Sequence, residues 1–168
     1  LPLLTGDAEK IAMEADLSTY DGFVVVSGDG LVNEVVNGLL NREDWEEACA
    51  RFSIGHIPAG SGNGLSTSVA RVSGENLSLV SAAFVIVKGR TRKLDVFACT
   101  APPDARSDKG DMSVRYGFLS LSWAMISEID IESENYRCCG SFRFTWAALV
   151  SIMKMKRYSA KIAYLPET

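Results

Sequence analysis

Two glycine-rich stretches decide the fold of this chain: Phe-Val-Val-Val-Ser-Gly-Asp-Gly at residues 23–30 and Ile-Pro-Ala-Gly-Ser-Gly-Asn-Gly at residues 57–64. In each, a short apolar run leads into a Gly-x-Gly turn and then into a helical pattern. Glycine adopts positive φ angles and has no Cβ, so such a turn can bring bare backbone N–H groups close to an anion. Both turns are therefore predicted to bind phosphate at the carboxyl ends of neighbouring parallel strands.

The hydrophobic pattern around these turns predicts the first half of the chain. Apolar residues at helical spacing predict helices at residues 6–17, 31–40 and 45–50, and a further helix that begins at Leu65. The uninterrupted apolar run at residues 23–26 predicts a strand buried on both faces of a parallel sheet. The apolar pattern of residues 52–57 predicts a second strand, adjacent to the first in the sheet. The first half is therefore an α/β, nucleotide-binding domain, expected to span residues 1–83 and to lack its first strand and first phosphate turn.

The pattern changes after residue 83. Short apolar stretches at residues 84–87, 94–100 and 114–121, joined by polar loops, predict strands of an antiparallel sheet. An apolar helical pattern follows at residues 144–155, and residues 158–165 predict a last strand. Residues 84–168 are therefore expected to form part of an antiparallel β-rich domain that carries helices of a lipid site.

Composition excludes several classes of protein. The 168 residues are 47% hydrophobic and 23% charged, as in globular proteins, and a net charge of −4 argues against nucleic-acid binding by bulk electrostatics. Four cysteines without a C-x-x-C spacing predict free thiols in a reducing compartment. The single histidine, His56, lies in an apolar run and is expected to be a satisfied core residue. Because the chain does not begin with Met, we expect it to be a fragment of a longer protein.

Neither turn matches the better-known phosphate motifs. No lysine follows either glycine pair as in the P-loop, and Asn33 stands where the Rossmann fingerprint has a glycine. Asp29 is also unusual, because a carboxylate between two glycines repels a phosphate bound at the same turn. It is either an Asx turn or cap for the following helix, or a base or Mg²⁺-positioning group in phosphoryl transfer. The residues alone leave both explanations open.

Several motifs in order resemble one known family. Residues 27–39 (SGDGLVNEVVNGL) and 58–65 (PAGSGNGL) are similar to the diacylglycerol-kinase-type lipid kinase catalytic domain, in particular to its sphingosine kinase branch. The similarity continues at Trp123, at residues 130–137 (DIESENYR), at residues 142–144 (FRF) and at residues 164–166 (YLP). It therefore covers nearly the whole chain.

This resemblance implies transfer of the γ-phosphoryl group of ATP, bound with Mg²⁺, to the primary hydroxyl of sphingosine or a related sphingoid base. It implies that Asp29 is the general base that activates this hydroxyl. It places these residues at the nucleotide: Thr5, Ser27, Gly28, Gly30, Glu34, Gly60, Ser61, Gly62, Asn63, Arg137 and Arg143. It assigns the sphingoid head group to Asp130 and the rest of the lipid to Trp123, Met125, Ile126 and Phe144. It leaves the metal ligands unknown and gives Glu34 a part in organising the metal or the glycine turn.

Other interpretations remain. Without the resemblance, the alternating carboxylates of residues 128–134 are typical of a solvated face, and the aromatic residues nearby of a core. The alternatives in function are a ceramide or diacylglycerol kinase and a truncated, non-catalytic module that binds nucleotide or lipid. The expected partners are the sphingoid-base lipid and, transiently, a membrane surface, with a cytoplasmic location and no nucleic acid. Homodimer formation is left open.

Overall fold

The computed structural model describes residues 6–101, 113–133, 135–136, 140, 142–154, 156–161 and 163. The chain divides into two compact units, Leu1–Ser120 and Leu121–Thr168, and each is described by itself. The first unit holds the two glycine turns, and the second holds the predicted lipid-site residues. Two predicted nucleotide residues, Thr5 and Arg137, lie outside the described residues.

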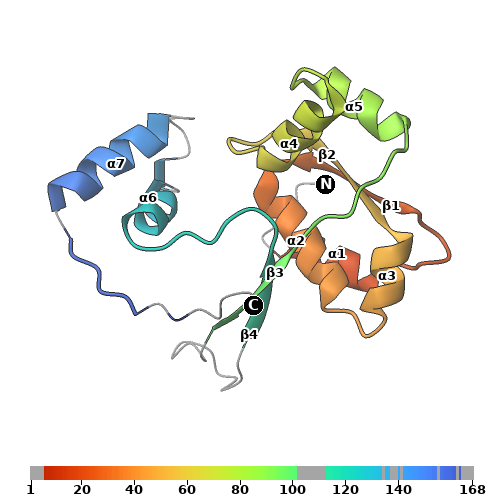
Figure 1. Ribbon diagram of the computed structural model, residues 1–168, viewed down its shortest axis with the longest axis horizontal. Helices are drawn as coiled ribbons and strands as arrows, with labels where there is room; N and C mark the ends of the chain where they lie inside the picture. Colours follow the sequence, from red (N-terminus) through yellow and green to blue (C-terminus); the bar gives the residue numbers. More distant parts are fainter. Residues whose placement is uncertain are drawn as a thin grey trace. The chain divides into compact units, whose positions relative to one another are not determined.

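The first unit is built on a parallel strand pair. Strands β1 (Gly22–Ser27) and β2 (Ser53–Pro58) pair in parallel, with Val25 opposite His56. Helix α1 (Asp7–Glu14) precedes β1, and helices α2 (Asp29–Leu40) and α3 (Trp45–Arg51) lie between the two strands along the chain (Figure 1). The predicted βαβ connection and its parallel pairing are confirmed.

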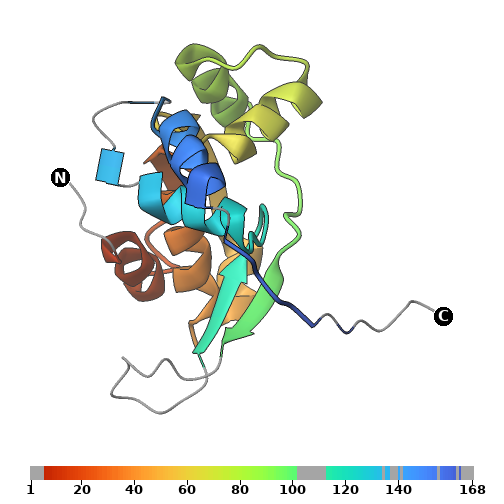
Figure 2. The same ribbon diagram turned by 90° about the vertical axis from the view of Figure 1, so that its left-hand side faces the viewer.

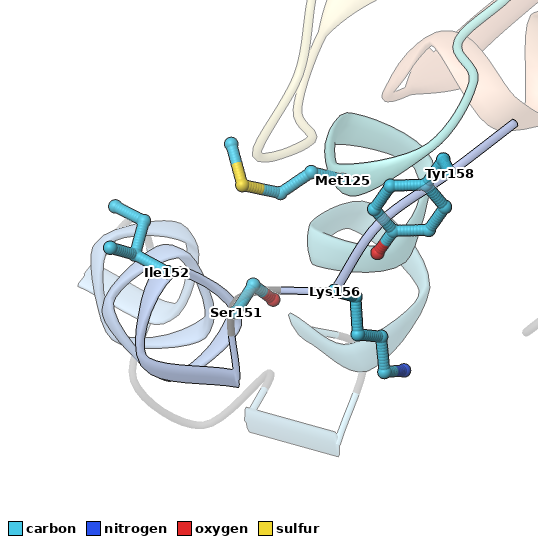
Figure 3. A pocket seen from close by; sticks show the side chains of 5 residues that line it. All are labelled: Met125, Ser151, Ile152, Lys156 and Tyr158. Atoms are coloured by element: carbon cyan, nitrogen blue, oxygen red, sulfur yellow. The ribbon is translucent and has the colours of Figure 1, made fainter.

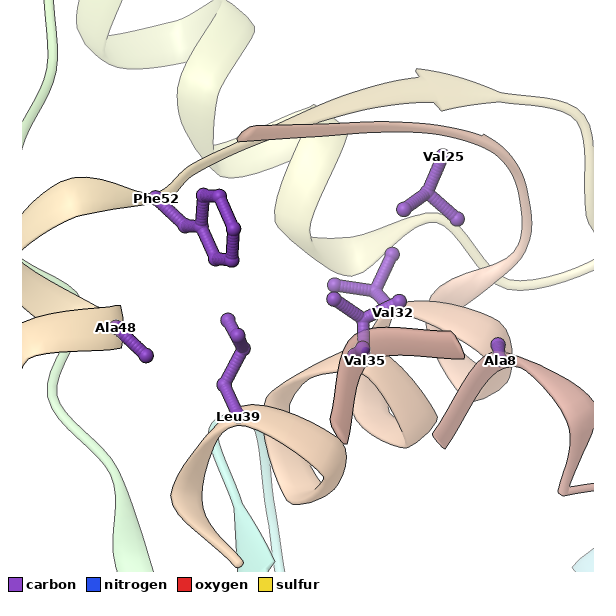
Figure 4. Packing of buried hydrophobic residues seen from close by; sticks show 8 residues of the cluster. Ala8, Val25, Val32, Val35, Leu39, Ala48 and Phe52 are labelled. Carbon is purple, nitrogen blue, oxygen red and sulfur yellow. The ribbon is translucent and has the colours of Figure 1, made fainter. Parts of the chain in front are cut away.

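The hydrophobic core of this unit lies against one face of β1. Val25 points from the strand toward Val32 and Val35 of α2 (Figure 4). The other buried residues of the cluster are Ala8, Ala12, Leu39, Ala48 and Phe52. The neighbouring β1 residues Val24 and Val26 are 59% and 60% exposed. Successive side chains of a strand point to opposite faces, so Val24 and Val26 lie on the face opposite to Val25. On that second face, Ile86 of helix α5 lies close to Gly55 of β2. That cover does not bury Val24 or Val26, so the prediction that β1 is buried on both faces is wrong.

Helices α4 (Gly64–Ser73) and α5 (Leu79–Val87) follow the second glycine turn. The structure contradicts the strand predicted at residues 84–87, because these residues form the second half of α5. The Ser78 hydroxyl accepts a hydrogen bond from the Ser81 N–H at 3.0 Å and caps this helix. Valine and isoleucine favoured the strand prediction. The cap and the nine-residue length of the segment, in which only Ser81 is polar, instead specify a helix.

An antiparallel hairpin completes the first unit, as predicted for this part of the chain. Strands β3 (Phe97–Ala101) and β4 (Ser113–Gly117) pair with Phe97 opposite Gly117. The buried Asn37 side chain of α2 donates to the Tyr116 carbonyl at 2.8 Å and accepts from the Tyr116 N–H at 2.9 Å. The hairpin therefore belongs to the first compact unit, which ends at Ser120, whereas the boundary expected near residue 83 falls within α5.

The second unit contains helices α6 (Met125–Ser133) and α7 (Phe142–Lys154) (Figure 2). Helix α7 confirms the helical pattern of residues 144–155. Lys154 of α7 forms an ion pair with Glu132 of α6 at 2.8 Å. Residues 158–161 are not in a strand, which contradicts the described part of the strand predicted at 158–165. Within the described ranges, no helix has both the length and the apolar character needed to cross a bilayer.

Candidate nucleotide and phosphoryl-transfer site

The two glycine turns touch each other at the carboxyl ends of β1 and β2. A Cβ on Gly60 would lie 2.3 Å from the Gly28 Cα atom, and a Cβ on Gly28 would lie 2.9 Å from the Gly62 carbonyl oxygen. The Asp29 N–H donates to that Gly62 oxygen at 3.1 Å, and the Ala59 N–H donates to the Ser27 carbonyl at 3.0 Å. Glycine is needed at both positions because the backbones of the two turns are in contact.

Asp29 extends from the first turn to the helix that follows the second. Its Oδ2 atom accepts from the Gly64 N–H at 2.6 Å, and its Oδ1 atom accepts from the Leu65 N–H at 3.0 Å. These are the first N–H groups of α4, so the carboxylate caps α4 and lies at the positive end of its dipole. Asp29 is thus a helix cap, but for α4 rather than for the helix that follows it in sequence. The side chain stays 17% exposed.

The second turn is closed by its own asparagine. Asn63 accepts from the Gly60 N–H at 3.0 Å and donates to the Gly60 carbonyl at 2.7 Å. Ser61 and Gly62 lie exposed between these two residues. Because the N–H groups of Gly60, Gly64 and Leu65 already have partners within the chain, this turn presents fewer donors to a phosphate than its sequence indicates.

The first turn has the opposite character. Gly28 is the N-cap of α2, and no side chain of the described residues caps this helix. Of the first N–H groups of α2, that of Asp29 already donates to the Gly62 carbonyl oxygen. Within the same part of the chain, a Cβ on Gly30 would meet nothing within 4 Å, so α2 borders open space at this residue. The unpaired N–H groups at the start of a helix attract anions. The start of α2 is therefore the better placed of the two helix ends to receive a phosphate.

Two further predicted nucleotide residues lie on the elements that flank this site. The Ser27 hydroxyl donates to the Gly28 carbonyl at 2.8 Å, which braces the end of β1. Glu34 of α2 accepts from the Gly6 N–H at 3.1 Å with its Oε2 atom. This contact joins α2 to the residue that precedes α1.

His56 is a residue of this site that sequence reasoning assigned to the core. It is buried in β2, and its Nε2 atom lies 2.8 Å from the Ser27 carbonyl oxygen. Its Nδ1 atom lies 4.0 Å from Asp29 Oδ1. The only signal in the sequence was its place on the strand that leads into the second turn.

The structure brings some of the predicted lipid residues together in the second unit. The Trp123 ring packs edge-on against Tyr158 with centroids 6.0 Å apart, and Met125 lines a pocket of about 280 Å³ with Ser151, Ile152, Lys156 and Tyr158 (Figure 3). Trp123 also lines a second pocket of about 450 Å³ on the α6 side. Asp130 and Ile126 are exposed on α6. The buried Arg143 guanidinium lies over the ring of Phe144, 4.5 Å from its centroid.

One of the alternating carboxylates is not simply solvated. Glu128 accepts hydrogen bonds from the Lys156 ammonium group and the Tyr158 hydroxyl. The Lys156 contact, followed by the Tyr158 contact, lowers the pKa of Glu128. The same hydrogen bonds raise the pKa of Lys156 and of Tyr158. Glu128 therefore ties the segment after α7 to α6, beside both pockets.

The described residues give no metal centre made by side chains alone. No group of three or more His, Cys, Asp or Glu side chains lies close enough within these ranges to hold an ion. A Mg²⁺ ion that arrives with ATP takes many of its ligands from phosphate oxygens and water and needs one or two carboxylates. The residues around Asp29 are compatible with MgATP as the substrate, and no ligand of the ion is assigned.

Comparison with known proteins relates this chain to lipid kinases. The model of the diacylglycerol kinase catalytic domain matches residues 4–99. Sphingosine kinase 1 of Arabidopsis thaliana is 43% identical over 159 residues, which cover 95% of this chain and 31% of that protein. Sphingosine kinase 2 of Homo sapiens is 36% identical over 166 residues, which cover 96% of this chain and 24% of that protein. The chain thus spans less than a third of the length of either relative.

Proposed function

The chain belongs to the diacylglycerol kinase catalytic domain family, and from this premise we propose that it is part of a lipid kinase. The reaction is transfer of the γ-phosphoryl group of MgATP to the primary hydroxyl of sphingosine or a related sphingoid base. The observation that carries the proposal is the contact between the two glycine turns, with the Asp29 carboxylate spanning them at the carboxyl ends of both strands. Ligands of open α/β sheets bind at this edge.

In this proposal the first unit positions the phosphates and accepts the proton. The start of α2, open at Gly30 and without a side-chain cap, binds phosphate oxygens of the nucleotide. Asp29 takes the proton of the lipid hydroxyl as that oxygen attacks the γ-phosphorus, and the β-phosphate oxygen leaves with the electrons of the broken bond. The two N–H bonds from α4 hold the carboxylate in one orientation, which lowers the entropy lost on reaching the transition state.

The sphingoid assignment rests on the similarity to proteins named sphingosine kinase and on the exposed carboxylate of Asp130. A sphingoid base carries an amine that is cationic near neutral pH, and a diacylglycerol carries none. Asp130, exposed on α6, offers a carboxylate to that amine. Trp123 and Met125, which line the two pockets, offer apolar surface to the alkyl chain of the lipid. We propose that the whole protein works in the cytoplasm and meets its lipid at a membrane surface.

The test uses the full-length protein with γ-labelled ATP and equal amounts of sphingosine, ceramide and diacylglycerol. We expect label in sphingosine 1-phosphate, and an Asp29→Asn variant that binds ATP normally but transfers at least about 100-fold more slowly. Label in ceramide or diacylglycerol alone would contradict the sphingoid assignment. ATP binding without label in any lipid would identify a non-catalytic module.

A further inference from the structure

The buried ring of His56 has one satisfied nitrogen and one that faces Asp29. The Nε2 atom lies 2.8 Å from the Ser27 carbonyl oxygen, and a carbonyl can only accept, so Nε2 carries a proton. In the neutral ring, Nδ1 is then a bare acceptor. This atom is buried and has no hydrogen-bond donor among the described residues. The His56 side chain is 1% exposed, so bulk water does not supply that donor either.

The charged group that faces Nδ1 is the Asp29 carboxylate, whose Oδ1 atom lies 4.0 Å away. An ionised carboxylate only accepts hydrogen bonds, so two acceptors face each other and the separation is about 1 Å longer than a hydrogen bond. The other hydrogen-bond and strand-pairing partners of His56 among the described residues carry no charge. Val25 pairs with it on β1, and the Ser66 hydroxyl of α4 donates to its backbone carbonyl at 3.1 Å.

A single proton changes this arrangement. When Asp29 carries a proton on Oδ1, the O–H group becomes the donor that Nδ1 lacks. A shift of about 1 Å that loosens the bond from the Leu65 N–H to Oδ1 then brings the two atoms within hydrogen-bond distance. A buried acceptor without a partner is costly, and a proton on Asp29 Oδ1 supplies the partner that Nδ1 lacks. The same protonated state follows when Asp29 accepts the proton of a lipid hydroxyl.

We propose that His56 is a positioning residue that acts through Asp29, because its bare Nδ1 receives a hydrogen bond from the carboxyl group once Asp29 has taken the substrate proton. The inference deepens the proposed function and rests on it. The hydroxyl O–H bond breaks as the new O–P bond forms, and the proton moves to Asp29, where it is shared with Nδ1. The Nε2–H bond to Ser27 stays in place throughout and fixes the plane of the ring.

Two substitutions separate this role from a purely structural one. In His56→Gln, the terminal amide reaches the position of Nε2 and can keep the bond to the Ser27 carbonyl, but no polar atom faces Asp29. In His56→Asn, the amide lies near the position of Nδ1 and keeps a polar partner for Asp29, while the bond to Ser27 is lost. Thermal unfolding of both variants shows which of them keeps the fold.

We expect His56→Gln to lower kcat for sphingosine phosphorylation by about 10-fold or more with little change in KM for ATP, and His56→Asn to keep the larger share of kcat. If His56 only braces the strand end through Ser27, Gln will be close to wild type and Asn will be the weaker variant. That order of activities would overturn the proposal.

A spectroscopic measurement keeps the inference distinct from the kinase assignment. The imidazole ¹⁵N signals of His56 in the full-length protein are those that disappear in His56→Gln. We expect a proton on Nε2 and a bare Nδ1 in the free protein, and a shift of the Nδ1 signal toward a hydrogen-bonded nitrogen in Asp29→Asn, whose amide can donate. An unchanged Nδ1 signal would overturn the pairing of the two side chains. A protein without kinase activity but with this shift would overturn the proposed function and leave the pairing intact.

Discussion

The two glycine turns are alike in sequence and differ in what their helices expose. Among the residues that the structure describes, the helix after the first turn, α2, has no side-chain cap and borders open space at Gly30, and only the N–H of Asp29 at its start has a partner in the other turn. The turn before α4 is closed by Asn63, and the first N–H groups of α4 are taken by Asp29. The same Gly-x-Gly pattern thus produces one helix start that is open to a ligand and one that is used to hold a carboxylate.

The strongest way to break this comparison is to push the two turns apart. In Gly60→Ala, the new Cβ would lie 2.3 Å from the Gly28 Cα atom and 2.5 Å from the Gly28 nitrogen, and neither backbone atom can rotate away. We expect a loss of about 3 kcal/mol in the free energy of unfolding, measured by urea denaturation of the full-length protein. The matched control is Gly30→Ala, where the Cβ meets open space within a helix and stability should rise slightly. Equal stability of the two variants would contradict the contact.

The second prediction separates the cap from the charge of Asp29. Asp29→Ala removes both hydrogen bonds to the start of α4, so we expect a loss of about 1–2 kcal/mol in the free energy of unfolding. Asp29→Asn keeps an oxygen that can accept one of these bonds and should lose less than half as much. If Asn and Ala cost the same, the cap does not depend on an acceptor at this position.

The third prediction concerns the closure of the second turn. Asn63→Ala removes the two hydrogen bonds between this side chain and Gly60, and we expect a loss of about 1 kcal/mol in the free energy of unfolding. It should also free the Gly60 N–H, so that the turn gains affinity for an anion such as inorganic phosphate, measured by calorimetry. Asn63→Asp is the control, because its carboxylate still accepts from Gly60 while adding a charge that repels the anion. Unchanged phosphate affinity in Asn63→Ala would show that the closed turn was not withholding a donor.

The smallest effect is expected at the end of β1. Ser27→Ala removes the short-range bond from the hydroxyl to the Gly28 carbonyl, but the backbone bond from Ala59 to the Ser27 carbonyl remains. We expect a change of no more than about 0.5 kcal/mol in the free energy of unfolding. A loss as large as that of Asn63→Ala would mean that the first turn depends on side-chain closure as much as the second does.

The parts of the fold that could be predicted are those encoded locally. A strand, a glycine turn and a helix follow one another within each stretch, so the parallel pair and α2, α3 and α4 were found from spacing alone. Helix α5 was partly misread because its cap at Ser78 lies before the valine-rich segment that indicated a strand. The exposure of Val24 depends on how much of the sheet surface helix α5 covers, and the pattern of residues within β1 does not specify this.

The site follows the same rule. The two turns were expected at one edge of the sheet, and the structure brings them into contact there. The partner of Asp29 could not be predicted, because Gly64 and Leu65 reach it only after β2 is paired with β1. His56 was taken for a core residue because its burial is visible in the apolar pattern, while its distance to Asp29 is not. Long-range geometry, rather than residue type, decided each of these cases.

The contact between Gly28 and Gly60 also restricts how this site can change through evolution. Each glycine blocks a side chain on the other with backbone atoms, so no second substitution at the partner can restore the space that a first one fills. Replacement of either glycine by a residue with a Cβ is therefore excluded whatever residue occupies the other position. Substitutions are accommodated more readily at residues whose neighbours are side chains, such as those that surround Trp123 and Tyr158 in the second unit.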